Sequence, residues 1–128
     1  MGMDFQYAGS ASYPRFDEEL TAIAKLFGAE LTEHLKEKID TEPKTMCDYW
    51  FGTLSSMEPN DKKFTFPKNT NPVLVKWFNN PYGDFNFEET KTIWDILKYK
   101  HDEIEKISSQ IWQELKYCRE CGRPWYIY

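Results

Sequence analysis

The spacing of apolar residues changes along this 128-residue chain and divides it into segments. Over residues 17–39 apolar side chains recur every three or four positions, which predicts an amphipathic helix. Asp17 is the expected N-cap of this helix, Gly28 interrupts its pattern, and Pro43 follows its end. A second, shorter helix is expected over about residues 45–57, where a capping box precedes a new apolar stripe.

The pattern becomes β-like between residues 62 and 87. Residues 64–66 and 73–78 are rich in aromatic and β-branched side chains, and turn-forming residues separate the two runs. A strong turn signal follows at residues 79–84. This segment is therefore predicted to be either a small β-hairpin or a long aromatic loop over the helices.

Helical spacing returns over residues 86–118 and predicts the longest helix of the chain. Asn86 followed three residues later by Glu89 marks its start. A helix of roughly 32 residues would be about 48 Å long, whereas a compact domain of this size is about 36 Å across. We therefore expect either a break near residues 98–102 or a projecting helix that serves as a self-association surface.

These segments together predict a mainly helical α+β fold in one domain. It would contain two or three helices, with the small β-hairpin or aromatic loop placed before the long C-terminal helix. Residues 1–13 are rich in small and polar side chains and are expected to be a flexible N-terminal tail. Residues 14–128 are expected to form a single globular domain, since this length suits one hydrophobic core.

Composition narrows the class of protein. Aromatic residues make up 17% of the chain and charged residues 29%, which is typical of a folded, soluble protein. The chain shows no bilayer-spanning apolar run and no secretory signal, so no membrane partner is expected. Three cysteines fit a reducing compartment better than a disulfide scaffold, and we predict a cytoplasmic protein. The net charge of −5 argues against broad binding to phosphate backbones.

The most specific chemical motif is the pair Cys118 and Cys121, followed by Gly122. This spacing is that of a zinc knuckle, in which two thiolates bind the metal from one tight turn. A closed zinc site needs four ligands, and the other candidates are Cys47, His34 and His101. Alternatively, the cysteines are packed at a helix end where Gly122 is the C′ residue. We expect no cofactor, with zinc as the alternative.

A basic and aromatic segment supports a second hypothesis. Lysines alternate with aromatic rings between residues 62 and 78, and no acidic residue interrupts them. Such a surface could stack nucleic-acid bases within a basic groove. Alternatively, the rings form the inward face of a hairpin and the lysines its exposed rim. The residues concerned are Lys62, Lys63, Phe64, Phe66, Lys68, Lys76 and Trp77.

The C-terminus is unusually aromatic for a chain end and is expected to dock, either on its own domain or on a partner. No catalytic motif is visible, so an enzyme is not expected. We predict a small intracellular protein-interaction module of the accessory, inhibitor or immunity type, binding another protein or itself. The alternative is a zinc-stabilised nucleic-acid-binding domain. The predicted partner-binding residues are Trp94, Trp112, Leu115, Trp125, Tyr126 and Tyr128.

Overall fold

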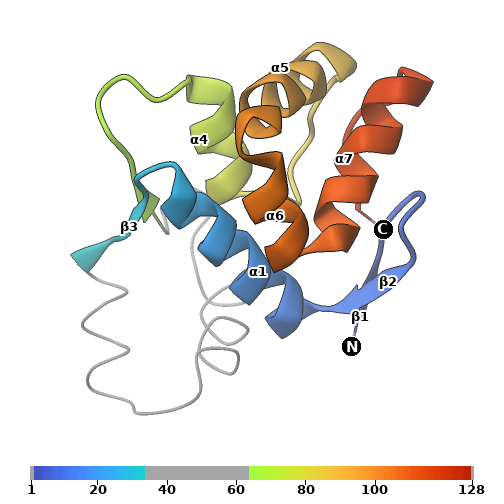
Figure 1. The fold of residues 1–128 in the computed structure, drawn as a ribbon, viewed down its shortest axis with the longest axis horizontal. Helices are drawn as coiled ribbons and strands as arrows, with labels where there is room; N and C mark the ends of the chain where they lie inside the picture. The colour runs from blue at the N-terminus through green and yellow to red at the C-terminus, as the bar shows by residue number, and fades with distance from the viewer. Residues whose placement is uncertain (1, 34–63, 128) are drawn as a thin grey trace.

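Helices form most of the fold, and two small antiparallel sheets lie at its edges (Figure 1). The structure is a computed structural model that describes residues 2–33 and 64–127. The predicted mainly helical α+β class is confirmed. In chain order the elements are β1 (Gly2–Asp4), β2 (Ser10–Ser12), α1 (Tyr13–Leu26), β3 (Glu30–Leu31), β4 (Phe64–Thr65), α4 (Pro72–Asn79), α5 (Phe87–Leu97), the 3-10 helix η1 (Lys98–Lys100), α6 (His101–Ile107) and α7 (Ser109–Cys121).

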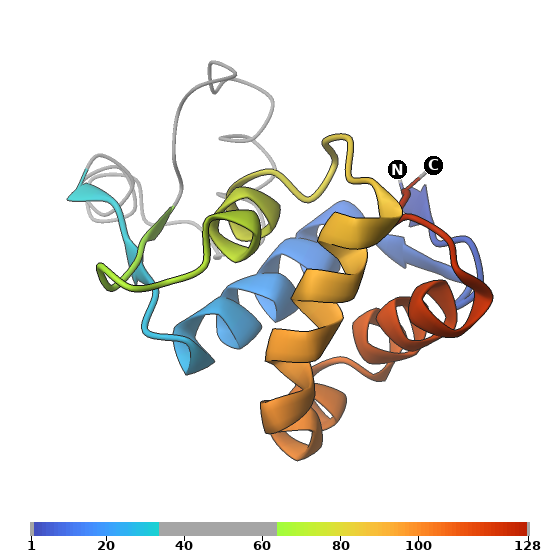
Figure 2. The ribbon, with the colours of Figure 1, turned by 90° about the horizontal axis from the view of Figure 1, so that it is seen from above.

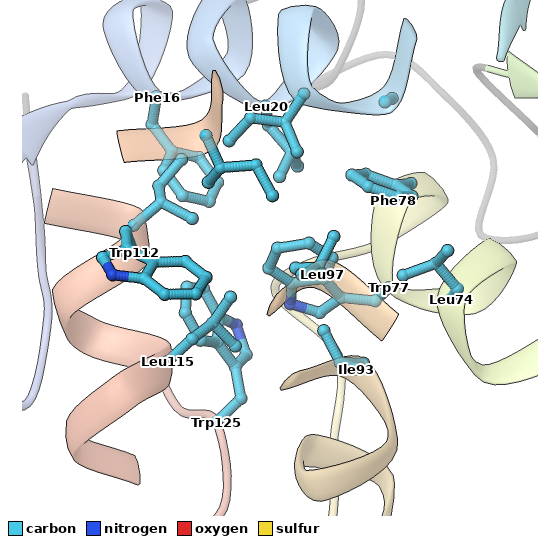
Figure 3. Close-up of a cluster of buried hydrophobic side chains, with 14 of the residues drawn as sticks. Phe16, Leu20, Leu74, Trp77, Phe78, Ile93, Leu97, Trp112, Leu115 and Trp125 are labelled. Atoms are coloured by element: carbon cyan, nitrogen blue, oxygen red, sulfur yellow. The ribbon is translucent and has the colours of Figure 1, made fainter. Parts of the chain in front are cut away.

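The helices enclose one apolar core. The last helix, α7, packs against α5 and α6, while α4 packs against α5, and α1 contacts both α4 and α6 (Figures 1 and 2). Aromatic side chains from different helices converge between these elements (Figure 3). The largest side chains of this core that have almost no solvent exposure are those of Trp77, Trp125, Phe16, Phe64 and Phe78.

Helix α1 begins and ends earlier than predicted. Ser12, and not Asp17, is the N-cap, and its hydroxyl accepts a hydrogen bond from the Arg15 amide at 3.3 Å. The helix ends at Leu26, and two residues later Gly28 has a φ of +83°, which belongs to the left-handed region. A Cβ at this position would lie 2.8 Å from Pro67 Cγ, so glycine is also required by close packing.

Beyond Gly28 the apolar pattern continues in an extended chain. Strand β3 pairs antiparallel with β4, with Leu31 opposite Phe64 and Glu30 opposite Thr65. Leu31 was predicted to lie on the same helix as Phe27, because both fit helical spacing. The second predicted helix, over about residues 45–57, lies outside the described residues.

Residues 73–78 were expected to lie in a β-hairpin or an aromatic loop, and they form helix α4 instead. The Asn71 side chain caps the helix by accepting a hydrogen bond from the Val73 amide at 2.9 Å, and Pro72 occupies the first turn. Leu74, Trp77 and Phe78 then fall on one buried face. Capping and burial therefore outweigh the β propensity of the individual residues.

The long C-terminal helix is broken, which is one of the two outcomes that the length argument predicted. Helix α5 begins at the predicted capping box, in which Asn86 and Glu89 exchange hydrogen bonds of 2.8 and 3.1 Å. The chain then passes through η1 at Lys98–Lys100, inside the predicted break. A second break, which was not predicted, occurs at Ser108, whose side chain caps α7. The two breaks let α7 fold back against α5 and α6.

The N-terminal segment differs from the flexible tail that we expected over residues 1–13. Strands β1 and β2 form an antiparallel hairpin in which Met3 lies opposite Ala11. Met3 and Phe5 are buried in the core, with only 1% and 6% of their surface exposed. Phe5 also forms an antiparallel bridge with Ile127, so both ends of the chain meet at this hairpin. Burial of these two side chains supplies the free energy that orders the segment.

Candidate functional site

Helix α7 presents three side chains to the turn of the N-terminal hairpin. Gln110, Glu114 and Cys118 are spaced four residues apart and therefore share one helix face. We call the contacts between this face and residues 5–10 the hairpin–α7 junction. The junction joins segments that are about one hundred positions apart in the sequence.

Glu114 is fully buried, with 0% of its surface exposed, and its carboxylate accepts three backbone hydrogen bonds. The Gln6 amide donates to Oε2 at 2.9 Å, and the amides of Tyr7 and Ala8 donate to Oε1 at 2.8 and 3.1 Å. These donors compensate for the cost of removing a charged group from water. Glu114 therefore fixes the backbone of the hairpin turn.

Gln110 complements Glu114 one helical turn earlier. Its side-chain amide donates to the carbonyl oxygens of Ala8 and Ser10 at 3.1 and 2.9 Å. Its own oxygen accepts a hydrogen bond from the Arg15 guanidinium at the start of α1. The same helix face thus satisfies both donors and acceptors of the turn, which leaves little freedom in this backbone.

Cys118 lies at the inner end of the junction and is completely buried. Its Sγ is 3.5 Å from Gln6 Nε2, 3.6 Å from the Pro124 carbonyl oxygen and 3.9 Å from Glu114 Oε2. Burial, and then the neighbouring Glu114 carboxylate, raise the pKa of the Cys118 thiol to about 12. Cys118 is therefore held as a neutral thiol in this environment.

Cys121 lies one turn further on and is exposed, so the two cysteines have opposite surroundings. As expected, Gly122 ends the helix, with a left-handed φ of +66°. Among the described residues, the side chains of His, Cys, Asp and Glu do not gather in any group of three that could hold a metal ion. Zinc binding with Cys47 or His34 remains a prediction, since both lie outside these residues.

Two exposed tyrosines cover the outer side of the junction. Tyr7 and Tyr117 are 39% and 41% exposed, and their ring centroids are 5.8 Å apart. Partial burial and the nearby Cys121 thiol raise the pKa of the Tyr7 hydroxyl. We call this pair the tyrosine surface. It was missed by sequence reasoning because Tyr7 belongs to the segment expected to be a flexible tail.

The predicted partner-binding residues divide between core and surface. Trp112, Leu115 and Trp125 are buried, with exposures of 8%, 0% and 1%, so they stabilise this domain. Trp94 is half-buried and stacks on Trp112 with centroids 4.5 Å apart. Tyr126 is 49% exposed and remains accessible. Tyr128 lies outside the described residues.

The C-terminal segment docks on its own domain, which was one of the two predicted outcomes. The Trp125 indole donates to the Pro81 carbonyl oxygen at 2.9 Å, and its backbone amide donates to Thr90 Oγ1 at 2.8 Å. Its ring meets the ring of Trp77 edge to face at 5.3 Å (Figure 3). Trp125 therefore completes the core beside α4 and α5.

The basic and aromatic segment does not present its rings for base stacking. Phe64 and Trp77 are buried, and Phe66 is half-buried against Phe78. Lys76 is paired with Glu89 at 3.1 Å, so part of its charge is compensated. Lys68 is exposed, whereas Lys62 and Lys63 lie outside the described residues. The described part of this segment thus matches the alternative in which its rings face inward.

Comparisons with protein-family models, curated protein sequences and solved structures give no match to this chain. Within residues 2–33 and 64–127, no helix combines the length and apolar character needed to cross a lipid bilayer. Any functional hypothesis therefore depends on the side chains themselves. Of these, Glu114 carried one sequence signal, because it is an acidic residue next to the apolar stripe of the last helix.

Proposed function

We propose that this chain is a small non-catalytic protein-interaction module that contacts a protein partner through its tyrosine surface. The observation that carries the proposal is the exposed Tyr7–Tyr117 pair on backbone that is fixed by the hairpin–α7 junction. The proposal keeps the predicted class of function. It moves the binding surface away from Trp112, Leu115 and Trp125, which are core residues.

Tyrosine suits this role for a physical reason. Its ring buries a large area while only two side-chain torsions lose freedom, and its hydroxyl retains a polar partner at the edge of an interface. Aromatic residues are accordingly enriched at protein interfaces. Tyr7 N already donates to Glu114 at 2.8 Å, so binding need not order this backbone. A pre-ordered surface loses less entropy when a partner binds.

A double variant, Tyr7→Ser with Tyr117→Ser, tests the proposal. A partner would first be captured from native extract on the wild-type protein, then purified and titrated against wild type and variant. We expect the variant to bind at least about tenfold more weakly, which corresponds to about 1.4 kcal/mol. Tyr99→Ser is the matched control, because Tyr99 is 83% exposed on η1, outside the tyrosine surface.

Equal affinity of the double variant and the wild type would overturn the proposed surface. The melting temperature of each variant shows whether the fold is retained, so that lost binding is not confused with unfolding. Sedimentation of the purified wild type identifies the case in which the partner is a second copy. Salt dependence separates the nucleic-acid alternative, because phosphate binding weakens steeply with salt and an aromatic interface does not.

A further inference from the structure

We propose that Cys118 and Cys121 form a thiol-modification site, in which a small disulfide oxidant links them and thereby loosens the hairpin–α7 junction. The proposal does not depend on the protein-interaction function, since it concerns only contacts within this chain. It rests on the spacing of the two cysteines, their opposite exposure and the contacts made by the buried thiol.

The spacing brings the sulfurs close to bonding range. Residues three apart in an α-helix have Cα atoms about 5 Å apart, within the range found for disulfides. Their Cβ atoms are about 5–6 Å apart, however, whereas a disulfide requires about 4 Å. The last turn of α7 must therefore change shape before the bond can form.

The end of α7 permits this change. Cys121 is the last helical residue, so few backbone hydrogen bonds lie beyond it. Gly122 follows with a φ of +66°, and no heavy atom lies within 4 Å of the position that a Cβ would occupy there. The terminal turn is held by the Gly122 and Arg123 amides, which both donate to the Cys118 carbonyl oxygen. Cys121 can approach Cys118 once these two hydrogen bonds open.

Exposure determines the order of the reaction. The exposed Cys121 thiolate attacks one sulfur of the small disulfide, breaks its S–S bond and releases one thiolate. Opening of the terminal turn then exposes Cys118, whose thiol loses its proton to solvent and attacks the Cys121 sulfur, which releases the second thiolate. In total, two protein thiols are oxidised to one disulfide, and one small disulfide is reduced to two thiols.

The product cannot keep the contacts of the reduced state. In the reduced protein Cys118 Sγ lies near Gln6 Nε2, the Pro124 carbonyl oxygen and Glu114 Oε2, all within 3.9 Å. To bond with Cys121 this sulfur must turn toward the exposed end of the helix. Gln6 and the C-terminal segment then lose a contact to α7. Oxidation is therefore expected to weaken the attachment of the hairpin.

The test treats the wild-type protein with oxidised glutathione and maps the cysteines by mass spectrometry. Free thiols are blocked at low pH before digestion, and trypsin cleavage after Arg119 then separates the two cysteines. A disulfide between them leaves two tryptic peptides joined, in a protein that stays monomeric without reductant. We expect these joined peptides, a melting temperature lower by about 5 °C and faster exchange of the Gln6, Tyr7 and Ala8 amides. Dithiothreitol should reverse all three.

Two single variants control the order of events. Cys118→Ser should stop at a glutathione adduct on Cys121, whereas Cys121→Ser should react about tenfold more slowly, because its remaining α7 thiol is buried. If the wild-type protein accumulates only the glutathione adduct, or only disulfides between two copies of the chain, the proposed Cys118–Cys121 disulfide is wrong. Joined peptides with unchanged melting temperature and amide exchange would overturn its effect on the junction. Exchange measured in the wild type keeps the test valid even if Cys118→Ser is unstable.

Discussion

The helical core and the hairpin–α7 junction stabilise this protein by different means. In the core, Trp77 contacts Trp125 and Phe78 at centroid distances of 5.3 and 5.0 Å, and burial of apolar surface is the main stabilising term. At the junction, one carboxylate, Glu114, accepts three hydrogen bonds from backbone amides. An apolar core tolerates substitution by apolar side chains of similar volume. The junction instead requires hydrogen-bond acceptors at defined positions. A substitution in the core should therefore destabilise the whole domain. A substitution at the hairpin–α7 junction should mainly loosen the hairpin.

The largest effect is expected from Trp77→Ala in the core. Trp77 is completely buried, and its removal leaves a cavity between α4, α5 and the C-terminal segment. We expect a loss of about 3–5 kcal/mol in the free energy of unfolding, measured by denaturant titration. Tyr99→Ala is the control, because Tyr99 is 83% exposed, and it should change the free energy of unfolding by less than about 0.5 kcal/mol. A small effect of Trp77→Ala would mean that the core is not the main source of stability.

A smaller but more local effect is expected from Glu114→Ala. The amides of Gln6, Tyr7 and Ala8 would lose their acceptor, at an expected cost of about 3 kcal/mol. Glu114→Gln keeps the size of the side chain but places an NH₂ group beside amide donors. It should therefore retain only part of the stability that Glu114→Ala loses. Hydrogen exchange should accelerate at these three amides and change little in α4. Gln113→Ala is the matched control, since Gln113 is exposed on the same helix. Uniform acceleration across the chain would contradict the distinction drawn between core and junction.

The smallest effect concerns the capping box of α5, which lies outside both regions. The hydrogen bond from the Asn86 amide, and then the one from Lys76, lower the pKa of Glu89 from its ordinary value of 4.5. A lowered pKa stabilises the fold above the ordinary value, and this stabilisation disappears as the pH falls through the lowered one. Glu89→Gln should therefore cost less than about 1 kcal/mol at neutral pH and nothing in strong acid. Unfolding of both proteins measured across this pH range checks the sign, and a constant difference would contradict it.

Local chemistry was sufficient to predict several features of the fold. The capping box at Asn86 and Glu89 and the helix end at Gly122 depend on neighbouring residues alone, and the structure contains both. Comparing helix length with domain size left two alternatives, a break or a projecting helix, and the structure has the break at Lys98–Lys100. Such features could be predicted because their causes lie within a few residues, or in the overall size of the chain.

Other features could not be predicted because their causes are distant in sequence. Helix α1 ends just before Gly28, where Pro67 packs against the glycine, and the chain continues as β3 because β4 is available as a partner. Residues 73–78 have β propensity yet form a helix, because that conformation buries Leu74, Trp77 and Phe78 together. In these cases tertiary packing outweighed the local preference.

The candidate site shows the same division between local and tertiary causes. By itself the sequence determined that Cys118 and Cys121 lie at the end of the last helix, next to a capping glycine, because spacing and capping are local properties. Only the tertiary structure buried one thiol and exposed the other. Only the tertiary structure placed Tyr7 beside Tyr117 and brought the hairpin amides to Glu114, which lies 106–108 positions away. Such contacts depend on how the whole chain closes around its core, and no local pattern records that arrangement.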